Sequence, residues 1–296
     1  MTIRRVALVG GTHGNELTGV SLIRKWQSQP DLVARPSFKA ECLIANPEAV
    51  TANKRYLDVD LNRQFSLDRL SRDIPDRDAC RARELNRQLG PKGAAVTDMI
   101  IDLHTTTANM GCTLVITSED AFHLQMCAWL SLQMPSAFMT SERALMEDHH
   151  FLSSISDRNI LVEVGPVPQG LLRADAFSLS EKAVGHILDF IELYNRNALP
   201  ALPGSLELYR YFDTVPLPVD GAGELAGMVH PQLQDQDFRE LTPGQPILQR
   251  FDGSEITWQG PAGVYASFIN EAAYYDQKLA FSLLEKVTVD VPAAID

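Results

Sequence analysis

A histidine and a glutamate stand in the glycine-rich turn 10–16, directly after an apolar stretch. The H-x-x-E spacing of His13 and Glu16 places both side chains on one side of helix-like backbone, where they could share an ion. Imidazole nitrogen and carboxylate oxygen are both normal zinc ligands. The alternative is a turn histidine beside a solvated glutamate, since H-x-x-E is common by chance. The position beyond the end of a predicted strand favours ligand binding.

A second histidine, His104, ends the apolar stretch 99–103. Asp102 lies on the same face of the predicted strand, where it could orient a ligating imidazole. For His104 alone, a hydrogen-bonded histidine at a sheet edge is an equal alternative. Together, however, His13, Glu16 and His104 at the ends of two buried strands predict a catalytic zinc that keeps one position open for water.

Glu163 interrupts the apolar stretch 161–164, just before Gly165-Pro166. A carboxylate between two valines either faces outward or is functional, because burying an unpaired charge is costly. Beside a zinc site it is the natural general base, which takes a proton from water.

Two arginines and an asparagine, Arg55, Asn62 and Arg63, lie in one short polar stretch. The planar fork of an arginine suits both an oxyanion and a carboxylate. The alternative is ordinary surface ion pairing with Asp58 and Asp60, and the spacing alone favours that alternative.

Other chemistries leave weaker signals. The turn 10–16 lacks G-x-G-x-x-G spacing, and no Gly-Lys-Ser/Thr P-loop occurs. The 4 cysteines form no C-x-x-C pair, which indicates reduced thiols rather than disulfides or zinc ligands. The net charge of -12 disfavours nucleic acid and anionic membranes as partners. A small anionic substrate would therefore need a local cluster of Arg or Lys.

The elements that must position these residues alternate along the first two thirds of the 296-residue chain. Strands are expected at 6–9, 38–45, 99–103, 112–117 and 159–164. Helices are expected at 16–26, at 78–89, between the strand 112–117 and residue 130, and in the segment that begins at residue 178. Ser178 and Glu181 read as a capping box at the start of the last helix. This alternation predicts an α/β domain at 1–199 with a mostly parallel, covered sheet.

The composition changes at the Pro- and Gly-containing stretch 199–204, which is typical of a linker. Short alternating strands follow, with a hairpin signal at Asp252-Gly253. We therefore expect a smaller β-rich domain at 200–296. The apolar part of the N-terminus is too short for a signal peptide, and no stretch has the length of a membrane span. A cytoplasmic protein is expected.

Ordered segments along nearly the whole chain resemble the succinylglutamate desuccinylase/aspartoacylase family, which is related to the zinc carboxypeptidases. They are GGTHGNELTG at 10–19, RYLDVDLNRQF at 55–65, DLHTTTANMGCTL at 102–114, VEVGPVPQGLLRAD at 162–175, HPQLQDQDF at 230–238 and NEAAYY at 270–275. The resemblance implies a carboxypeptidase-like mixed sheet with helices on both faces, and a β-rich C-terminal domain that narrows the active-site channel.

The resemblance also implies hydrolysis of the amide bond of an N-acyl-L-amino acid with one zinc per chain, and a homodimer. The roles it implies are zinc ligands for His13, Glu16 and His104, the catalytic carboxylate for Glu163, polarisation of the scissile carbonyl for Arg55, substrate-carboxylate contacts for Asn62 and Arg63, and channel residues of the C-terminal domain for Tyr274 and Lys278.

One segment departs from the family pattern. Aspartoacylases carry a further arginine, shortly before the catalytic glutamate, that helps hold the side-chain carboxylate of the substrate. An ungapped alignment places Ser153 there, and a gap would bring in Arg143 or Arg158. We expect N-acetyl-L-aspartate as the first substrate, and N-acetylated aromatic or other neutral amino acids as the second. A zinc carboxypeptidase for peptides and a non-catalytic metal-binding module are the alternatives from other classes.

Overall fold

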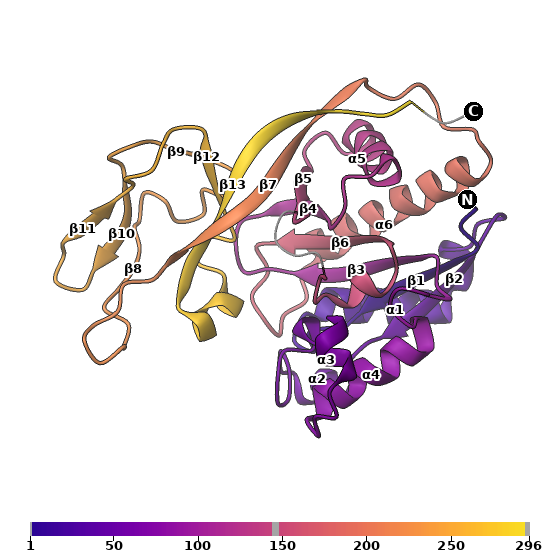
Figure 1. Ribbon diagram of the computed structural model, residues 1–296, viewed down its shortest axis with the longest axis horizontal. Coiled ribbons are helices and arrows are strands. Elements are labelled where there is room, and N and C mark those ends of the chain that lie inside the picture. The colour runs from indigo at the N-terminus through magenta and orange to yellow at the C-terminus, as the bar shows by residue number, and fades with distance from the viewer. Residues whose placement is uncertain (1, 144–147, 294–296) are drawn as a thin grey trace.

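The computed structural model describes residues 2–143 and 148–293, and a 10-stranded sheet runs through it (Figure 1). The strand order is β2-β1-β3-β6-β4-β5-β7-β13-β12-β9, and a 3-stranded sheet, β11-β10-β8, lies at one end. The strands are β1 (Arg5–Gly10), β2 (Lys39–Ile44), β3 (Met99–Thr105), β4 (Gly111–Ile116), β5 (Phe138–Ser141), β6 (Arg158–Gly165), β7 (Ser205–Pro216), β8 (Gly227–Val229), β9 (Glu240–Leu241), β10 (Pro246–Arg250), β11 (Glu255–Thr257), β12 (Val264–Ser267) and β13 (Leu279–Asp290).

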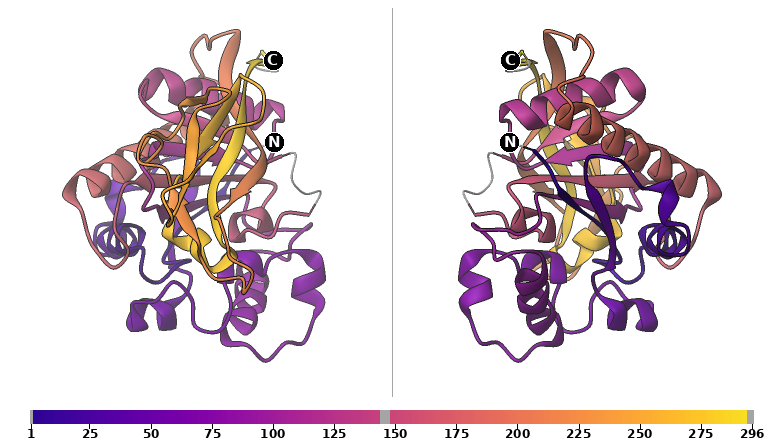
Figure 2. Two further views of the ribbon diagram at one scale, coloured as in Figure 1. Left: turned by 90° about the vertical axis from the view of Figure 1, so that its left-hand side faces the viewer. Right: turned by 90° about the vertical axis from the view of Figure 1, so that its right-hand side faces the viewer.

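Helices cover both faces of the N-terminal half of this sheet (Figures 1 and 2). They are α1 (Leu17–Ser28), α2 (Pro47–Ala52), α3 (Leu67–Ser71), α4 (Arg77–Leu89), α5 (Ala121–Gln133) and α6 (Ala174–Asn195). Alternate residues of β1 separate the two layers, because successive side chains of a strand point to opposite faces. Val6 and Leu8 pack in the core with α1, α5 and α6, whereas Ala7 and Val9 pack in the core with α4. The predicted mixed α/β sheet with helices on both faces is confirmed.

The last helix of this half, α6, begins earlier than the sequence predicts. It starts at Ala174, so Ser178 lies inside the helix and the predicted capping box is wrong. The Glu181 carboxylate instead accepts hydrogen bonds from Nζ of Lys25, at 2.7 and 2.8 Å, and ties α6 to α1. Buried side chains from Ala176 onward pack on the core, so tertiary packing rather than a cap sets where the helix begins.

The sheet continues past the linker predicted at 199–204. β7 pairs with β5 in parallel, and β13 pairs with β7 along most of its length. The remaining C-terminal strands enclose a separate small core that includes Leu241, Ala266 and Phe281. A turn with Gly253 at φ +87° joins β10 to β11, as the Asp252-Gly253 signal predicts. No helix among the described residues is long and apolar enough to cross a membrane.

Candidate active site

The predicted metal ligands meet where three parallel strands end. β1, β3 and β6 are neighbours in the sheet, and their register places His104 opposite Glu163. His13 lies in the turn after β1, and Glu16 directly precedes α1. The side chains therefore converge beyond the carboxyl ends of the strands, which is where open α/β sheets bind ligands.

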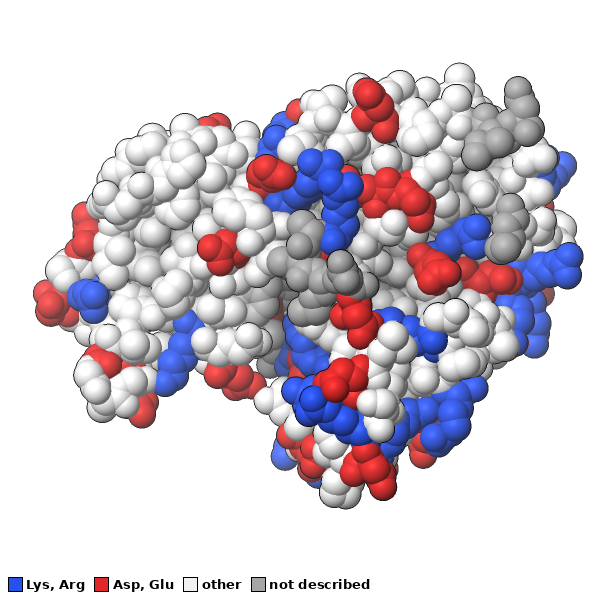
Figure 3. Space-filling view, in the orientation of Figure 1, with Lys and Arg blue, Asp and Glu red and all other residues white. Residues whose placement is uncertain are grey.

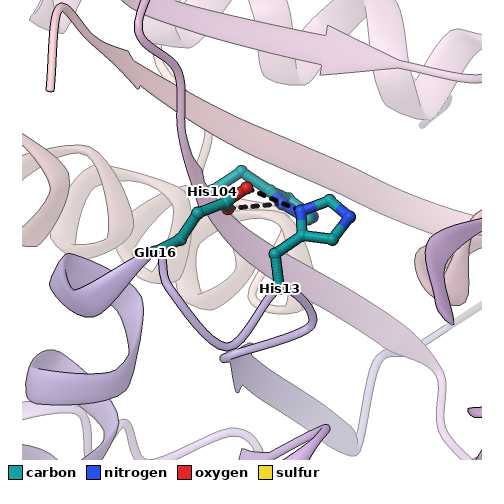
Figure 4. Close-up of side chains that lie close together, drawn as sticks. All are labelled: His13, Glu16 and His104. Atoms are coloured by element: carbon teal, nitrogen blue, oxygen red, sulfur yellow. Dashed lines mark hydrogen bonds and ion pairs between the residues drawn. The ribbon is translucent and has the colours of Figure 1, made fainter. Parts of the chain in front are cut away.

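His13, Glu16 and His104 form a buried group whose candidate ligand atoms all lie within 4.8 Å of one another. The Glu16 carboxylate stands between the two imidazoles (Figure 4). Its Oε1 lies 2.6 Å from Nδ1 of His13, and its Oε2 lies 2.9 Å from Nδ1 of His104. The Thr105 N–H donates to Glu16 Oε2 at 3.1 Å, which fixes the carboxylate.

Two further carboxylates approach the outer nitrogens of these histidines. Nε2 of His13 lies 3.1 Å from Oδ1 of Asp60, and Nε2 of His104 lies 3.0 Å from Oδ2 of Asp102. The other oxygen of Asp102 accepts a hydrogen bond from the Thr12 hydroxyl at 2.8 Å. The orienting role predicted for Asp102 thus has the required geometry.

This arrangement suits a bound cation. A neutral imidazole has only one N–H, yet both nitrogens of each ring face carboxylate oxygens. Burial opposes protonation of His104, but Asp102 and Glu16 outweigh that effect and raise the pKa of His104 well above its usual value. A metal ion held by His13, Glu16 and His104 would remove the conflict without extra protons. Two imidazole nitrogens and one carboxylate oxygen are a donor set that zinc accepts.

The loop that carries Arg55 is held by a buried carboxylate on α4. Oδ2 of Asp78 accepts hydrogen bonds from the backbone N–H groups of residues 57–59, at 2.7 to 3.1 Å. Arg55 then reaches inward, where its guanidinium donates to Oδ2 of Asp60 at 3.1 Å and to Oε1 of Glu16 at 3.2 Å. The ion pair with Asp60 that the sequence suggested does form, but at the metal-ligand group rather than on the surface.

Glu163 projects into the same cavity from β6. Burial raises its pKa to about 8, and the carboxylates of Glu16 and Glu271 add to the rise against the opposing charges of His104 and Arg55. A carboxyl group with a raised pKa can hold and release a proton near neutral pH, which is what general acid–base chemistry requires.

A cavity of about 270 Å³ opens beside this group. Residues from both halves of the chain line it, among them Arg55, Asn62, Arg63, Phe151, Leu161, Phe268 and Tyr274. Arg63 stacks over the Phe151 ring, with Cζ 5.4 Å from the ring centroid. Oδ1 of Asn62 accepts a hydrogen bond from Leu152 N at 2.8 Å, so this side chain also fixes the cavity wall.

The remaining predicted residues lie elsewhere. Lys278 turns away from the cavity, and its ammonium donates to the backbone carbonyl of Gly223. Arg143 forms an ion pair with Glu119 at 3.3 Å, and Arg158 stacks over Phe122 at the opposite end of β6 from Glu163. The Ser153 hydroxyl is buried and finds no hydrogen-bond partner among the described residues.

The described lining of the cavity contains few cationic side chains. Among the described lining residues, Arg55 and Arg63 are the only arginines or lysines. Lys278, for which a substrate contact was expected, is not among these lining residues, and its ammonium donates to the Gly223 carbonyl.

The sequence did not point to Glu271 as a site residue. Its buried carboxylate accepts hydrogen bonds through Oε2 from the Thr106 hydroxyl, from Thr107 N at 2.7 Å, from Thr107 Oγ1 at 2.9 Å and from Ala108 N at 3.3 Å. These contacts join the C-terminal part of the chain to the loop after β3. The only signal in the sequence was the conspicuous segment NEAAYY.

Comparison with known proteins agrees with this geometry. Residues 2–191 match the succinylglutamate desuccinylase/aspartoacylase catalytic domain, and residues 204–286 match the AstE/AspA barrel-sandwich hybrid domain. The chain belongs to the succinylglutamate desuccinylase/aspartoacylase family. It is accordingly an enzyme of a family of amide hydrolases.

Relatives of this family with two kinds of name are similar to the chain. A human N-acyl-aromatic-L-amino acid amidohydrolase (carboxylate-forming) is 46% identical over 98% of this chain and 93% of its own length. A probable aspartoacylase of Trichodesmium erythraeum is 40% identical over 98% of this chain and 99% of its own length. The crystal structure of murine aminoacylase 3 superposes with a TM-score of 0.92 at 44% identity, covering 99% of this chain and 98% of that one.

Proposed function

We propose that this enzyme is a zinc-dependent hydrolase of N-acyl-L-amino acids with neutral, preferentially aromatic, side chains. The products are a carboxylate and the free amino acid. The observation that carries the proposal is the cavity itself, where Glu163 and two arginines stand beside the His13–Glu16–His104 group, and where Phe151, Leu161 and Phe268 line part of the wall.

His13, Glu16 and His104 would hold the zinc, and Asp60 and Asp102 would orient the two imidazoles. When bound, zinc supplies Lewis acidity and lowers the pKa of a bound water. Glu163 takes a proton from the attacking water and returns it to the nitrogen of the leaving amino acid. Its raised pKa, about 8, suits a group that must carry out both transfers.

The two arginines have distinct tasks in this proposal. Arg55, held by Asp60 and Glu16, directs its guanidinium toward the reacting carbonyl and stabilises the negative charge that develops on its oxygen. Arg63 binds the α-carboxylate, which every N-acyl amino acid carries. Asn62 supports this subsite by fixing the backbone of Leu152.

N-acetyl-L-aspartate, expected from the sequence as the first substrate, becomes the second candidate substrate, after N-acylated aromatic amino acids. Its side-chain carboxylate requires another cation, and the described lining offers none beyond Arg55 and Arg63. Phe151, Leu161 and Phe268 instead favour an apolar side chain. Because some relatives are named aspartoacylase, N-acetyl-L-aspartate is included among the substrates to be assayed.

The C-terminal part, residues 200–296, would restrict this cavity to small substrates. Phe268, Glu271 and Tyr274 come from it and line the cavity that the N-terminal part opens. A narrow cavity disfavours the peptide-cleaving alternative. We also propose that the protein acts in the cytoplasm as a homodimer, which cell fractionation and light scattering on the purified protein would check.

The test combines metal analysis with a substrate panel. Elemental analysis should find one zinc per chain in the wild type, and His104→Ala should lose it. The wild type should hydrolyse N-acetyl-L-phenylalanine faster than N-acetyl-L-aspartate and leave a short peptide intact. Full zinc content in the variant would remove His104 from the ligand set. Release of amino acids from the peptide alone would establish a carboxypeptidase, and no turnover of any substrate by zinc-loaded protein would favour a non-catalytic module.

A further inference from the structure

Glu142 is an acidic residue in a cavity proposed to bind anionic substrates. It directly follows β5, and its backbone N–H donates to the Ile116 carbonyl at 3.0 Å, which continues the pairing with β4. The neighbouring Arg143 turns to Glu119, which also pairs with Arg210 of β7 at 2.7 Å. Glu142 itself lines the cavity.

The sheet places Glu142 and Glu163 at different ends of the cavity. Glu163 and Leu161 are two residues apart on β6, and both line the cavity. Leu161 lies nearer the start of β6, where it pairs with Val115 of β4. Val115, Leu161 and Phe151 pack together as a small apolar cluster. Glu142 is attached beside Ile116, the next residue of β4. The apolar cluster therefore lies between Glu163 at one end and Glu142 at the other.

Charged and titratable side chains from three elements surround Glu142. Arg63 lies near enough to lower the pKa of Glu142 electrostatically, but burial has the larger effect and raises that pKa to about 7. Burial raises the pKa values of Tyr211 on β7 and Tyr274 in the C-terminal part, and the charge of Glu142 adds to both rises. No hydrogen bond or ion pair joins the Glu142 carboxyl group to another described side chain.

The position of Arg63 decides which part of a substrate reaches Glu142. If Arg63 binds the α-carboxylate, the substituent on the same carbon, the amino-acid side chain, extends over Phe151 and Leu161. The acyl group lies on the other side of the amide nitrogen, beside Glu163.

We infer that Glu142 is a specificity-determining residue, which excludes N-acyl amino acids with a side-chain carboxylate and accepts a hydrogen bond from neutral side chains with a donor, such as a tyrosine hydroxyl. This inference rests on the proposed function. Two like charges in a water-poor cavity repel strongly, so an ionised Glu142 works against N-acetyl-L-aspartate. A carboxyl oxygen is also an acceptor that a phenol can reach at the end of an apolar subsite.

The experiment measures kcat/KM for N-acetyl-L-phenylalanine, N-acetyl-L-tyrosine and N-acetyl-L-aspartate with wild type and Glu142→Gln. At pH 8, where about 90% of Glu142 is ionised in the wild type, the ratio of aspartate to phenylalanine activity should rise about tenfold in the variant, because the repulsion is removed and the shape is kept. Glu285→Gln is the matched control. Glu285 is a half-exposed residue of β13, so its neutralisation should leave the ratio unchanged. An unchanged ratio in Glu142→Gln, with N-acetyl-L-phenylalanine still hydrolysed, would overturn the inference and leave the proposed function standing.

A second measurement compares two tyrosine substrates and does not depend on the folding of Glu142→Gln. N-acetyl-O-methyl-L-tyrosine lacks the phenolic donor, so its kcat/KM should fall about two- to tenfold below that of N-acetyl-L-tyrosine. Glu142→Met should abolish this difference. Equal activity of the wild type on both tyrosine derivatives would contradict an acceptor at this position. Failure of the wild type on every acyl amino acid would instead contradict the proposed function.

Discussion

Asp60 approaches His13 at the back of the metal-ligand group, with Oδ1 of Asp60 3.1 Å from Nε2 of His13. The other oxygen of the same carboxylate accepts hydrogen bonds from Arg55. Burial by itself would raise the pKa of Asp60, but His13 and Arg55 outweigh that effect and hold it well below the usual range. One carboxylate thereby orients both a predicted ligand and the predicted oxyanion-binding arginine.

We therefore expect Asp60→Asn to weaken zinc binding by about 10- to 100-fold, the usual effect of removing a carboxylate that orients a ligating histidine. Competition with a chelator measures the affinity. Asp58→Asn is the matched control, because Asp58 pairs with Arg77 on the surface at 2.6 Å. Equal metal affinity in wild type and Asp60→Asn would show that Asp60 is dispensable for positioning His13.

Surface charge is arranged differently from the charge in the cavity. Lys and Arg are intermixed with Asp and Glu on the face seen in Figure 3, most densely around α3 and α4. Pairs such as Arg72–Asp68 belong to this exposed set and contribute little to stability. By contrast, Glu16 and Asp102, the carboxylates beside His104, are buried.

The sequence predicted the centre of the site better than its surroundings. His13, Glu16, His104 and Glu163 lie at or just beyond the carboxyl ends of strands, and neighbouring parallel strands bring these ends together whatever the loops do. Asp60 and Glu142 lie in connecting segments whose course no periodicity encodes. Glu271 meets Thr106 and Thr107 across most of the chain. Such long-range contacts follow from tertiary packing, so local patterns could not reveal them.

Burial also explains which secondary-structure elements the sequence could predict. The strands β1, β3 and β6 are buried on both faces, so each is recognisable in the sequence as a continuous apolar stretch. The start of α6 was missed because Ala176 packs on the core ahead of the polar Ser178. Sheet order across residue 200 depends on the pairing of β5 with β7, for which the sequence holds no local signal.

Glu163→Gln should retain zinc and lose about 100- to 10,000-fold in kcat, the typical contribution of a general acid–base group. Gln keeps the size of the side chain but can neither accept nor return the proton. Elemental analysis and steady-state kinetics on N-acetyl-L-phenylalanine measure the two properties together. Turnover within a few-fold of wild type would assign the base elsewhere.

Glu271→Gln should destabilise the fold by about 1.5–3 kcal/mol, since it weakens charge-assisted hydrogen bonds to the loop after β3. Glu271 is only 4% exposed, so water cannot replace its contacts. Urea denaturation monitored by fluorescence measures the free energy of unfolding. Thr107→Val, which removes one of the donors, should show a smaller loss. A Glu271→Gln protein as stable as wild type would mean that these contacts add nothing net.

Lys278→Met should change the two substrate classes alike, because Lys278 contacts the Gly223 carbonyl rather than the cavity. The ratio of kcat/KM values for N-acetyl-L-aspartate and N-acetyl-L-phenylalanine should stay within about twofold of wild type, well below the effect of losing a charge-assisted contact to substrate. Lys278 also has a positive φ of 54°, so Lys278→Gly should fold well. A selective loss on N-acetyl-L-aspartate would restore Lys278 as a substrate contact.

The last prediction concerns how selectivity responds to pH. Because the pKa of Glu142 is raised to about 7, chiefly by burial, the group is mostly protonated below that value and mostly ionised above it. The ionised fraction rises from about 10% near pH 6 to about 90% near pH 8, while the carboxylates of N-acetyl-L-aspartate stay ionised throughout. If only the protonated form admits that substrate, its kcat/KM relative to N-acetyl-L-phenylalanine should fall about tenfold over this range.

Taking the ratio removes titrations that both substrates share, including that of Glu163. Among the groups around Glu142, the raised pKa values of Tyr211 and Tyr274 keep both hydroxyls neutral over this range. The slope should therefore belong to Glu142, and Glu142→Gln should give a flat ratio close to the wild-type value at low pH. A flat profile in wild type, or the same slope in Glu142→Gln, would show that another group sets the selectivity.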